Sequence, residues 1–444
     1  MATTNPARLP PMPAMNPYRT WQLVRRPVEF VQWAAQRCGD PFLVKAAEPL
    51  GSMTYTGDPE GIRAIFCADP DLLKPFRTEL FGPFLGPGSL LLLSGNAHRA
   101  ERKLLMPPFH GARMRAYGEQ IRDTAIRHAA ALAPERAFSM QNLTHAISLE
   151  IMIRAILGIT ETNRVRYALE AITAKVHEFT PVVIYFWHLQ RYLGNLGPWA
   201  RFRKRQETVL HMLDEEIERR ASSPGRGDDI LSLLLDARYE DNSPMSHQSV
   251  RDELVTLLFA GHETTAVALT WAFYELHRHP AIRHRLLGEL ESLGNDPDPE
   301  AVARLPYLDA VCHEALRLHP VAPLVTRWLT APFTLMGYEL PPGTGVGASI
   351  ILAHLNPSTY PEPLEFRPER FLERSFSAFE FLPFGGGARR CIGAAFAEYE
   401  MKLVLGALLT HYELELVNKT PERSVRRNLT MGPRTDVLMR MKKR

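Results

Sequence analysis

A helical stretch over residues 247–278 constrains the fold of this chain more than any other feature of its sequence. Ser246 or Ser249 can cap its start, because a serine hydroxyl accepts a hydrogen bond from a free N–H of the first turn. Residues 254–259 and 267–273 are mostly apolar. A helix that is apolar on most sides is a buried helix, so we expect a large, mostly helical body around it.

The middle of this stretch is polar. Gly261 is followed by His262, Glu263, Thr264 and Thr265, and a charge and two hydroxyls inside a buried helix are costly unless they are paired or hydrated. Gly261 also weakens the helix by about 1 kcal/mol relative to alanine. One interpretation is a kinked core helix whose hydroxyls bond back to its own carbonyl groups. The other is a functional site at the centre of the helix.

Most of the remaining sequence also predicts helix. Helical periodicity or composition extends over residues 114–133, 141–158, 163–178, 201–222, 280–293, 308–319 and 394–411. Strand-like segments are short and lie at Ser52–Thr56, Leu335–Leu340, Val346–Leu352, Tyr412–Val417 and Asp436–Met441. Strands and helices do not alternate regularly, which argues against a Rossmann-type sheet or a barrel. We therefore expect a mainly α fold with small β-sheets near both ends of the chain.

The charge and the cysteine content exclude several classes of protein. The net charge is only +3 and both signs are mixed along the chain, which argues against nucleic acid as a partner. The four cysteines, Cys38, Cys67, Cys312 and Cys391, are far apart. We therefore expect neither a disulfide framework nor a structural zinc site, and we expect a cytoplasmic protein.

The N-terminal residues resemble neither a signal peptide nor a membrane anchor. Prolines stand where a signal peptide would have its apolar core. No segment reaches the ~18 consecutive apolar residues of a membrane span, so we expect no transmembrane anchor. Residues 1–20 are predicted to form a loosely ordered N-terminal arm.

The segment 384–393 (Phe-Gly-Gly-Gly-Ala-Arg-Arg-Cys-Ile-Gly) carries the strongest chemical signal. Its three consecutive glycines let the backbone come close to a large, flat group. Cys391 lies just before an amphipathic helix, whose N-terminus favours a thiolate over a thiol. Arg389 can pair with a carboxylate of a bound group. The alternative interpretation is a lone buried cysteine that acts as a small apolar residue.

This segment resembles the haem-binding signature of the cytochromes P450, and three further motifs appear in that family's order. The segment 260–265 (Ala-Gly-His-Glu-Thr-Thr) resembles the oxygen-activating part of the family's long helix. The segment 314–317 (Glu-Ala-Leu-Arg) resembles its Glu-x-x-Arg helix, and 366–371 (Phe-Arg-Pro-Glu-Arg-Phe) resembles the meander motif that follows.

The resemblance covers nearly the whole chain and implies a single cytochrome P450 domain over residues 21–444. It implies haem b (iron protoporphyrin IX), buried between the helix at 247–278 and the cysteine loop. Cys391 would be the metal ligand, because a thiolate pushes electron density onto the iron and promotes O–O cleavage. Phe384 and Gly385 would belong to the cofactor-binding loop.

Haem has two propionates, and the family supplies basic side chains to bind them. Arginine suits carboxylates because its planar fork can bond both oxygens. The residues that match the family's propionate contacts by motif position are His98, Arg102, Arg327 and Arg389.

Glu263 and Thr264 are similar to the family's acid–alcohol pair and are our candidate catalytic residues. A hydroxyl beside the haem can hold the distal oxygen and an ordered water, and a carboxylate can link that water to bulk solvent. The pair implies a monooxygenase that inserts one oxygen atom of O₂ into a lipophilic small molecule, such as a fatty acid or a terpenoid. Two alternatives remain: a peroxide-driven peroxygenase or hydroperoxide isomerase, which often lacks this pair, and a non-catalytic haem-binding or sensor protein.

Glu314 and Arg317 lie one helical turn apart. By themselves they predict an exposed ion pair contributing about 0.2–0.5 kcal/mol. The resemblance implies instead a buried network of Glu314, Arg317 and Arg370 that braces the cysteine loop, with a structural role.

The resemblance also implies partners. No GxGxxG motif follows a predicted strand, so we expect electrons from a separate ferredoxin or flavodoxin with its reductase. An aromatic-rich stretch matches the family's lid over the substrate channel, although core packing explains it equally well; it comprises Phe179, Tyr185, Phe186, Trp187, Tyr192 and Trp199. A second, pocket-lining loop is expected at Phe76, Phe81, Phe84 and Leu90–Leu93. Apolar walls imply an apolar ligand.

Overall fold

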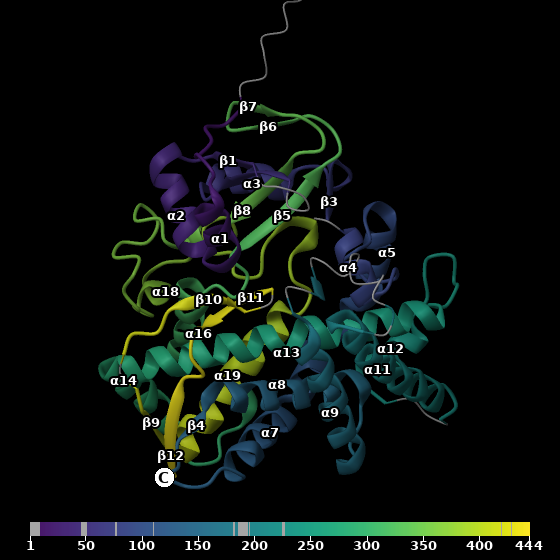
Figure 1. The fold of residues 1–444 in the computed structure, drawn as a ribbon. Coiled ribbons are helices and arrows are strands. Elements are labelled where there is room, and N and C mark those ends of the chain that lie inside the picture. Colours follow the sequence, from purple (N-terminus) through teal and green to yellow (C-terminus); the bar gives the residue numbers. More distant parts are fainter. Residues whose placement is uncertain are drawn as a thin grey trace, which may run out of the picture.

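The longest helix, α13 (His247–Arg278), crosses the molecule from side to side, with a sheet above it and further helices below it in Figure 1. The computed structural model describes residues 9–45, 51–75, 78–109, 111–180, 183–184, 194, 196–223, 227–418, 420–427 and 429–444. Ser246 caps α13 by accepting a hydrogen bond from the Ser249 N–H at 3.0 Å. The predicted buried helix is therefore confirmed, and the cap is Ser246.

Helices occupy most of the described chain. They are α1 (Pro17–Arg25), α2 (Pro27–Cys38), α3 (Pro59–Cys67), α4 (Thr78–Leu85), α5 (Gly95–Leu105), α6 (Gly111–Ala116), α7 (Gly118–Ala130), α8 (Met140–Leu157), α9 (Thr162–Glu178), α11 (Pro198–Ala221), α12 (Ile230–Asp236), α13, α14 (Pro280–Glu291), α15 (Pro299–Ala303), α16 (Pro306–Leu318), α17 (Ile350–His354), α18 (Arg370–Glu373) and α19 (Ala394–His411).

The strands are short. They are β1 (Phe42–Lys45), β2 (Ser52–Thr56), β3 (Leu73–Pro75), β4 (Phe138–Ser139), β5 (Leu324–Leu329), β6 (Phe333–Leu335), β7 (Tyr338–Leu340), β8 (Gly345–Ser349), β9 (Tyr412–Leu416), β10 (Ser424–Arg427), β11 (Thr430–Pro433) and β12 (Leu438–Lys443). The expected mainly α fold with small β-sheets is confirmed.

The helical core forms around α13. Its most extensive packing is against α8, and α19 contacts both α13 and α7. Gly261 lies where α13 meets α8, because a Cβ atom built on it would come within 2.2 Å of Met152 Cε. The glycine in the middle of the buried helix therefore has a packing role: it lets the two core helices approach each other.

A five-stranded sheet joins the two ends of the chain, in the order β1-β2-β8-β5-β3. β2 runs parallel to β8 and pairs Met53 with Gly345, whereas the other neighbours are antiparallel. Ile62, Ile65 and Phe66 of α3 pack in the same apolar cluster as β5 and β8. The remaining strands form a β4-β12-β9 sheet and the two hairpins β10–β11 and β6–β7.

Two of the predicted strands differ from the structure for local reasons. The segment expected as one strand at 335–340 is the β6–β7 hairpin, because Met336 and Gly337 both have positive φ, of 48° and 81°. The strand expected at 346–352 ends at Ser349, whose hydroxyl accepts a hydrogen bond from the Leu352 N–H and begins α17.

The division into an arm at 1–20 and a domain at 21–444 stays a prediction. Residues 1–8 lie outside the described part of the chain, and α1 begins within the expected arm, at Pro17. Pro11 accepts a hydrogen bond of 2.9 Å from the Leu43 N–H in β1. Residues 9–20 therefore lie against the sheet, partly in helical form.

No single helix in the described part of the chain is long and apolar enough to cross a membrane. α8 and α9 reach that criterion only as a pair, which is bent by 115° at the break between them.

Candidate active site

The cysteine loop precedes α19. The Cys391 N–H donates a 3.0 Å hydrogen bond to the carbonyl of Phe384, which folds the segment between them back on itself around a short 3₁₀ turn at Gly387–Arg389. The surface of Cys391 is exposed, whereas Phe384 and Gly385 are half-buried. Cys391 thus keeps an exposed surface, although the surrounding protein desolvates its thiol.

Two opposing effects act on the pKa of the Cys391 thiol. Desolvation by the surrounding protein raises the pKa of Cys391, while the Gly393 N–H and the cations of Arg102 and Arg390 lower it. The helix N-terminus, expected to favour the thiolate, is thus outweighed by desolvation. A metal cation bound at the sulfur would displace the proton directly.

The glycines of this loop allow a close approach to α3. A Cβ atom on Gly386 would lie 2.2 Å from the ring of Phe66, and one on Gly387 would lie 2.4 Å from the Phe66 carbonyl oxygen. Gly387 also has φ +66°, a conformation that favours glycine. The sequence predicted that these glycines approach a bound group. The structure instead explains two of them by contact with α3.

Four basic side chains from three parts of the chain lie near one another, and one of them, Arg102, lies beside Cys391. His98 and Arg102 come from α5, Arg327 from β5, and Arg389 from the cysteine loop. His98 is buried, and the pKa of its imidazole is lowered to about 4 by desolvation and then by the cations of Arg389, Arg102 and Arg327. The structure therefore brings together all four residues that motif position selected.

The three arginines of this cluster have no carboxylate partner within the described residues. Arg327 donates to its neighbouring carbonyl, that of Thr326, at 2.8 Å, and Arg389 donates to the Leu93 carbonyl. Desolvation lowers the pKa of both Arg327 and Arg389 to about 10, and repulsion adds to the effect, from Arg389 on Arg327 and from Arg102 on Arg389. Partly desolvated like charges are favourable only when an anion neutralises them, so the cluster fits a ligand with carboxylates, as haem has.

The centre of α13 presents a small accessible face. Ala260 is exposed and Thr264 half-buried, although the helix is buried over most of its length. The two residues are four apart and lie on one side of the helix. Thr264 Oγ1 donates to the Ala260 carbonyl at 2.8 Å, and Thr265 Oγ1 donates to that of Gly261 at 3.0 Å. These hydrogen bonds from the threonine hydroxyls to the carbonyl groups of their own helix were predicted by the interpretation of α13 as a core helix.

The environment of Glu263 differs from that of Thr264. It is buried, and its Oε1 accepts a 2.8 Å hydrogen bond from Thr430 Oγ1 in β11. Desolvation raises the pKa of Glu263, while Thr430 and the Arg427 cation lower it. Glu263 and Thr264 are adjacent in sequence but bond to different partners. Sequence analysis did not identify Thr430, which lies in no recognisable motif.

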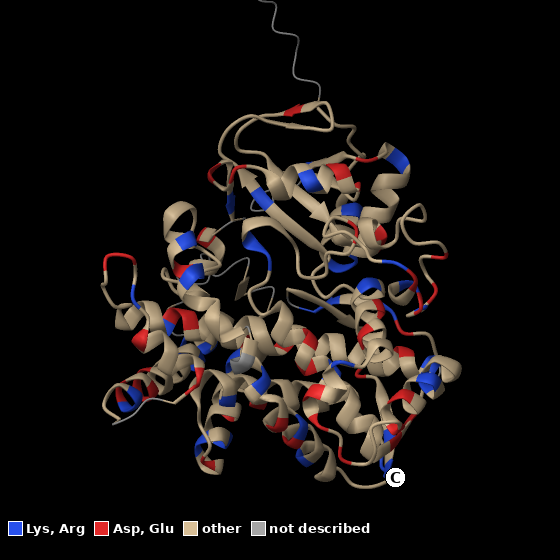
Figure 2. Cartoon of the chain, turned by 180° about the vertical axis from the view of Figure 1, so that it is seen from behind, with Lys and Arg blue, Asp and Glu red and all other residues tan. Residues whose placement is uncertain are grey.

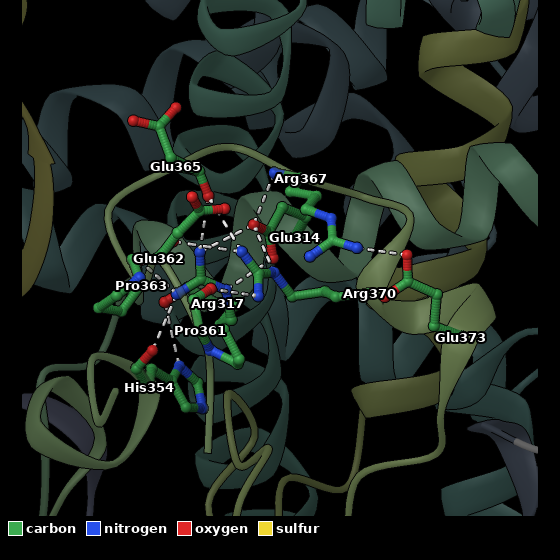
Figure 3. A network of polar contacts seen from close by, with 10 residues as sticks. All are labelled: Glu314, Arg317, His354, Pro361, Glu362, Pro363, Glu365, Arg367, Arg370 and Glu373. Atoms are coloured by element: carbon green, nitrogen blue, oxygen red, sulfur yellow. Dashed lines mark hydrogen bonds and ion pairs between the residues drawn. The ribbon is translucent and has the colours of Figure 1, made fainter. Parts of the chain in front are cut away.

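The Glu314 network is buried and fully bonded. Arg317 makes a two-point contact with Glu314, at 2.6 and 2.8 Å, and Arg370 Nε donates to Glu314 Oε1 at 3.0 Å. None of the three side chains is more than 4% exposed. The exposed ion pair predicted from spacing alone is therefore wrong, and the buried network is confirmed (Figure 3).

The network reaches the cysteine loop through His354. Arg317 donates to the carbonyls of His354 and Pro363, each at 2.8 Å (Figure 3). The His354 ring bonds the Arg317 carbonyl at 3.1 Å through Nδ1 and accepts from the Leu382 N–H at 3.0 Å through Nε2. Leu382 lies two residues before Phe384, so the network holds the start of the loop. Neither His354 nor Leu382 carried a sequence signal.

A small apolar cavity lies between α4, α9, α11 and α13. Phe84 and Phe179, both expected near a substrate, line it, and their ring centroids are 5.0 Å apart. Trp199 packs on Phe84, and Leu90 is buried. Several residues of the two expected aromatic segments lie outside the described residues: Phe76, Tyr185, Phe186, Trp187 and Tyr192.

Comparisons with known proteins agree on one family. The sequence profile of the cytochromes P450 matches residues 9–439. A relative from Mycobacterium tuberculosis, cytochrome P450 135B1, is 32% identical over 447 residues, covering 100% of this chain and 93% of its own. Cytochrome P450 138 from Mycobacterium bovis is 33% identical over 402 residues, covering 89% and 87%.

A solved structure agrees in fold. The retinoic acid-bound cyanobacterial CYP120A1 superposes with a TM-score of 0.86 at 23% identity, and the match covers 99% of this chain and 100% of that one. The mainly helical architecture is therefore the cytochrome P450 fold. With a profile match across nearly all its length and relatives above 30% identity, the chain belongs to the cytochrome P450 family and is a haem-dependent monooxygenase.

Proposed function

We propose that the chain binds haem b through Cys391 and inserts one oxygen atom of O₂ into a lipophilic small molecule. One observation carries the proposal: Cys391 lies beside Arg102, and Arg102 belongs to a cluster of four basic side chains whose three arginines lack any described carboxylate partner. That combination matches a ligand with a metal at its centre and carboxylates at its edge. When bound, a haem iron held by a thiolate supplies the chemistry of O₂ activation.

The chain's own residues have distinct tasks in this proposal. His98, Arg102, Arg327 and Arg389 bind the propionates and thereby fix the orientation of the cofactor. The loop residues Phe384 and Gly385 support Cys391, and the Glu314 network keeps that loop in place.

Proton delivery is assigned to α13. Thr264, on the accessible face of the helix, holds a water molecule by its hydroxyl. Glu263 has a pKa raised by desolvation, so it can both take up and release a proton nearer neutral pH than an exposed carboxylate can. Thr430 holds the carboxyl in place between transfers.

The lining of the cavity supports a lipophilic substrate, because most of its side chains are aliphatic or aromatic. Electrons would come from a separate ferredoxin or flavodoxin with its reductase. Arg99, Lys103 and Arg390 are exposed and are our candidate contacts for an acidic electron donor. We propose the cytoplasm as the compartment, since all four cysteines are free thiols.

The test of the thiolate assignment is spectroscopic. Carbon monoxide added to the reduced wild-type holoprotein should give the strongly red-shifted Soret band of thiolate ligation. Cys391→His should abolish this band and the oxygenase activity. Cys38→Ala, a substitution of a second free cysteine in α2, should change neither. Retention of the band in Cys391→Ala would disprove the assignment.

A further inference from the structure

The segment between α4 and α5, residues 86–93, is bonded to the first turns of α13. The Leu90 N–H donates a 2.6 Å hydrogen bond to Glu253 Oε1, and Thr256 Oγ1 bonds Ser89 Oγ at 2.7 Å. In Figure 1, α4 and α5 lie above the N-terminal half of α13. The long helix therefore fixes this segment from below.

The same segment supports the basic cluster. It ends at Leu93, whose carbonyl accepts a hydrogen bond from Arg389. α5 begins two residues later and carries His98 and Arg102. The positions of three of the four basic side chains therefore depend on how this segment is held.

Glu253 is a buried acid without an ion pair to any described cation. Its side chain is 0% exposed, and its Oε2 has no described hydrogen-bond partner. Glu101 of α5 resembles it: the side chain is 4% exposed, Oε2 accepts from the Tyr239 hydroxyl at 2.7 Å, and Oε1 has no described partner. Acids are almost never fully buried unless they are paired, because an unpaired buried charge destabilises a fold strongly.

The charged neighbours of Glu253 are themselves acids. Desolvation and the charges of Glu101 and Asp252 raise the pKa of Glu253 to about 9, against the lowering effect of the Leu90 N–H. A metal ion does not resolve this repulsion, since the described residues contain no group of three His, Cys, Asp or Glu side chains that could hold one. A proton is the remaining way to neutralise the site.

Other titratable groups on the surrounding elements do not supply a positive charge. Arg251 of α13 pairs with Asp214 of α11 at 3.1 Å, and Lys103 of α5 pairs with Glu240 at 3.0 Å. Burial raises the pKa of Tyr239, so its hydroxyl stays protonated and neutral. The two buried acids are thus left to each other.

We infer that Glu253 is a positioning residue for the basic cluster, and that it holds residues 86–93 as a neutral carboxylic acid. Oε1 accepts from the Leu90 N–H, and the proton lies on Oε2, which removes the charge that would face Glu101. The inference rests on the proposed function only for the identity of the group that the cluster binds. The anchoring itself is a matter of contacts within the chain.

A neutral Glu253 makes the opening of this segment depend on pH. When the segment opens, water reaches Glu253 and its pKa falls from about 9 towards its ordinary value of 4.5. Opening therefore releases a proton between these two pH values, so the closed form is most stable at the acidic end of the window and weakens as the pH rises towards 9. An acid that was already ionised in the closed form would release no proton.

Hydrogen–deuterium exchange of the purified full-length protein measures the opening. The protection factor of the peptide covering residues 86–93, corrected for intrinsic exchange, should fall by up to about tenfold per pH unit between pH 6 and pH 8. Glu253→Gln keeps the carbonyl acceptor and cannot ionise. It should be at least as well protected as the wild type at pH 6, better protected at pH 8, and independent of pH.

Glu253→Leu removes the acceptor for the Leu90 N–H. Its protection factor should be about 5–150-fold lower than that of Glu253→Gln, the range expected for a buried donor left unsatisfied. Transfer of haem to apomyoglobin should also be faster from Glu253→Leu than from Glu253→Gln, because the basic cluster loses its support. Glu207→Leu, at an exposed position of α11, should match the wild type in both measurements.

The outcomes separate this inference from the proposed function. A wild-type protection factor that does not change between pH 6 and pH 8, or a Glu253→Gln variant as poorly protected as Glu253→Leu, would overturn the neutral acid. Equal haem transfer from these two variants would overturn the link to the basic cluster. If protection followed the expected pattern but the carbon monoxide spectrum lacked thiolate ligation, the proposed function would fail and the anchoring by Glu253 would stand.

Discussion

Glu263 and Thr264 illustrate how neighbouring residues on one helix can be given separate environments. Successive positions on an α-helix point about 100° apart, so Thr264 lies on the accessible face with Ala260 while Glu263 is buried against Thr430. A proton that passes between the two must therefore move through water or through a rotation of the carboxyl group.

This separation predicts different defects. Thr264→Ala should keep its haem content and its substrate-induced spectral shift, but more of the oxygen consumed should appear as hydrogen peroxide. Glu263→Gln should slow turnover by about 10²–10⁴-fold, as for a lost acid–base group. The measurement is the ratio of peroxide formed to substrate oxidised. An unchanged ratio in Thr264→Ala with normal haem content would remove Thr264 from the mechanism and favour the peroxygenase alternative.

At the scale of elements, α3 packs closely against the cysteine loop. Gly386 and Gly387 have no room for a side chain beside Phe66. The loop is thus held from one side by α3 and from the other by the Glu314 network through His354. Its shape is fixed by the protein before any partner binds.

A matched pair of glycines tests this contact. Gly387 and Gly111 share φ +66°, but a Cβ atom on Gly111 would meet nothing within 4 Å. Gly111→Ala should lower the free energy of unfolding by about 1–2 kcal/mol through backbone strain alone. Gly387→Ala should lower it by about 2–4 kcal/mol because the clash is added, and should reduce the thiolate-type carbon monoxide signal. Equal losses in chemical denaturation would show that the contact with Phe66 is unimportant.

The elements also show what the sequence could and could not predict. The long helices were predictable because their periodicity is local, and α13 and α19 end where the pattern ends. The motifs predicted the buried Glu314 network, and they selected four basic residues that lie near one another in the structure, whose role in cofactor binding stays a prediction. β1, β3 and β5 were missed, since their pairing joins distant segments and leaves little local pattern. Phe66, His354 and Thr430 were missed because each acts through contacts far away in sequence.

At the scale of the whole molecule, the side seen in Figure 2 has no large area of a single charge. Lys and Arg are interspersed with Asp and Glu over the side seen in Figure 2, in keeping with a net charge of +3. Docking of an electron donor would then depend on a few local cations. Arg99 and Lys103 on α5 are exposed, although each has an acidic neighbour, Asp71 at 3.6 Å and Glu240 at 3.0 Å.

Docking of an electron donor through a few exposed cations should depend on the salt concentration. Turnover supported by an acidic ferredoxin should fall as ionic strength rises, because exposed charges are screened beyond ~8–10 Å. Arg99→Gln combined with Lys103→Gln should lower the rate at low salt and flatten this dependence. Lys204→Gln on α11 should behave as the wild type. A partner-supported rate that is indifferent to salt would contradict charge-steered docking.

The five-stranded sheet has a consequence for how the chain is made. β2 finds its parallel partner β8 about 290 residues later, where Met53 pairs with Gly345. At ~5–20 residues per second, roughly 15 to 60 s of synthesis separate the two strands on the ribosome. During that time the β1–β2 hairpin exposes an unpaired edge, which is a site for aggregation. Cys391 emerges from the ribosome later still. The sheet and the cofactor site can therefore be completed only after the chain has been synthesised beyond Cys391, and the holoprotein assembles late.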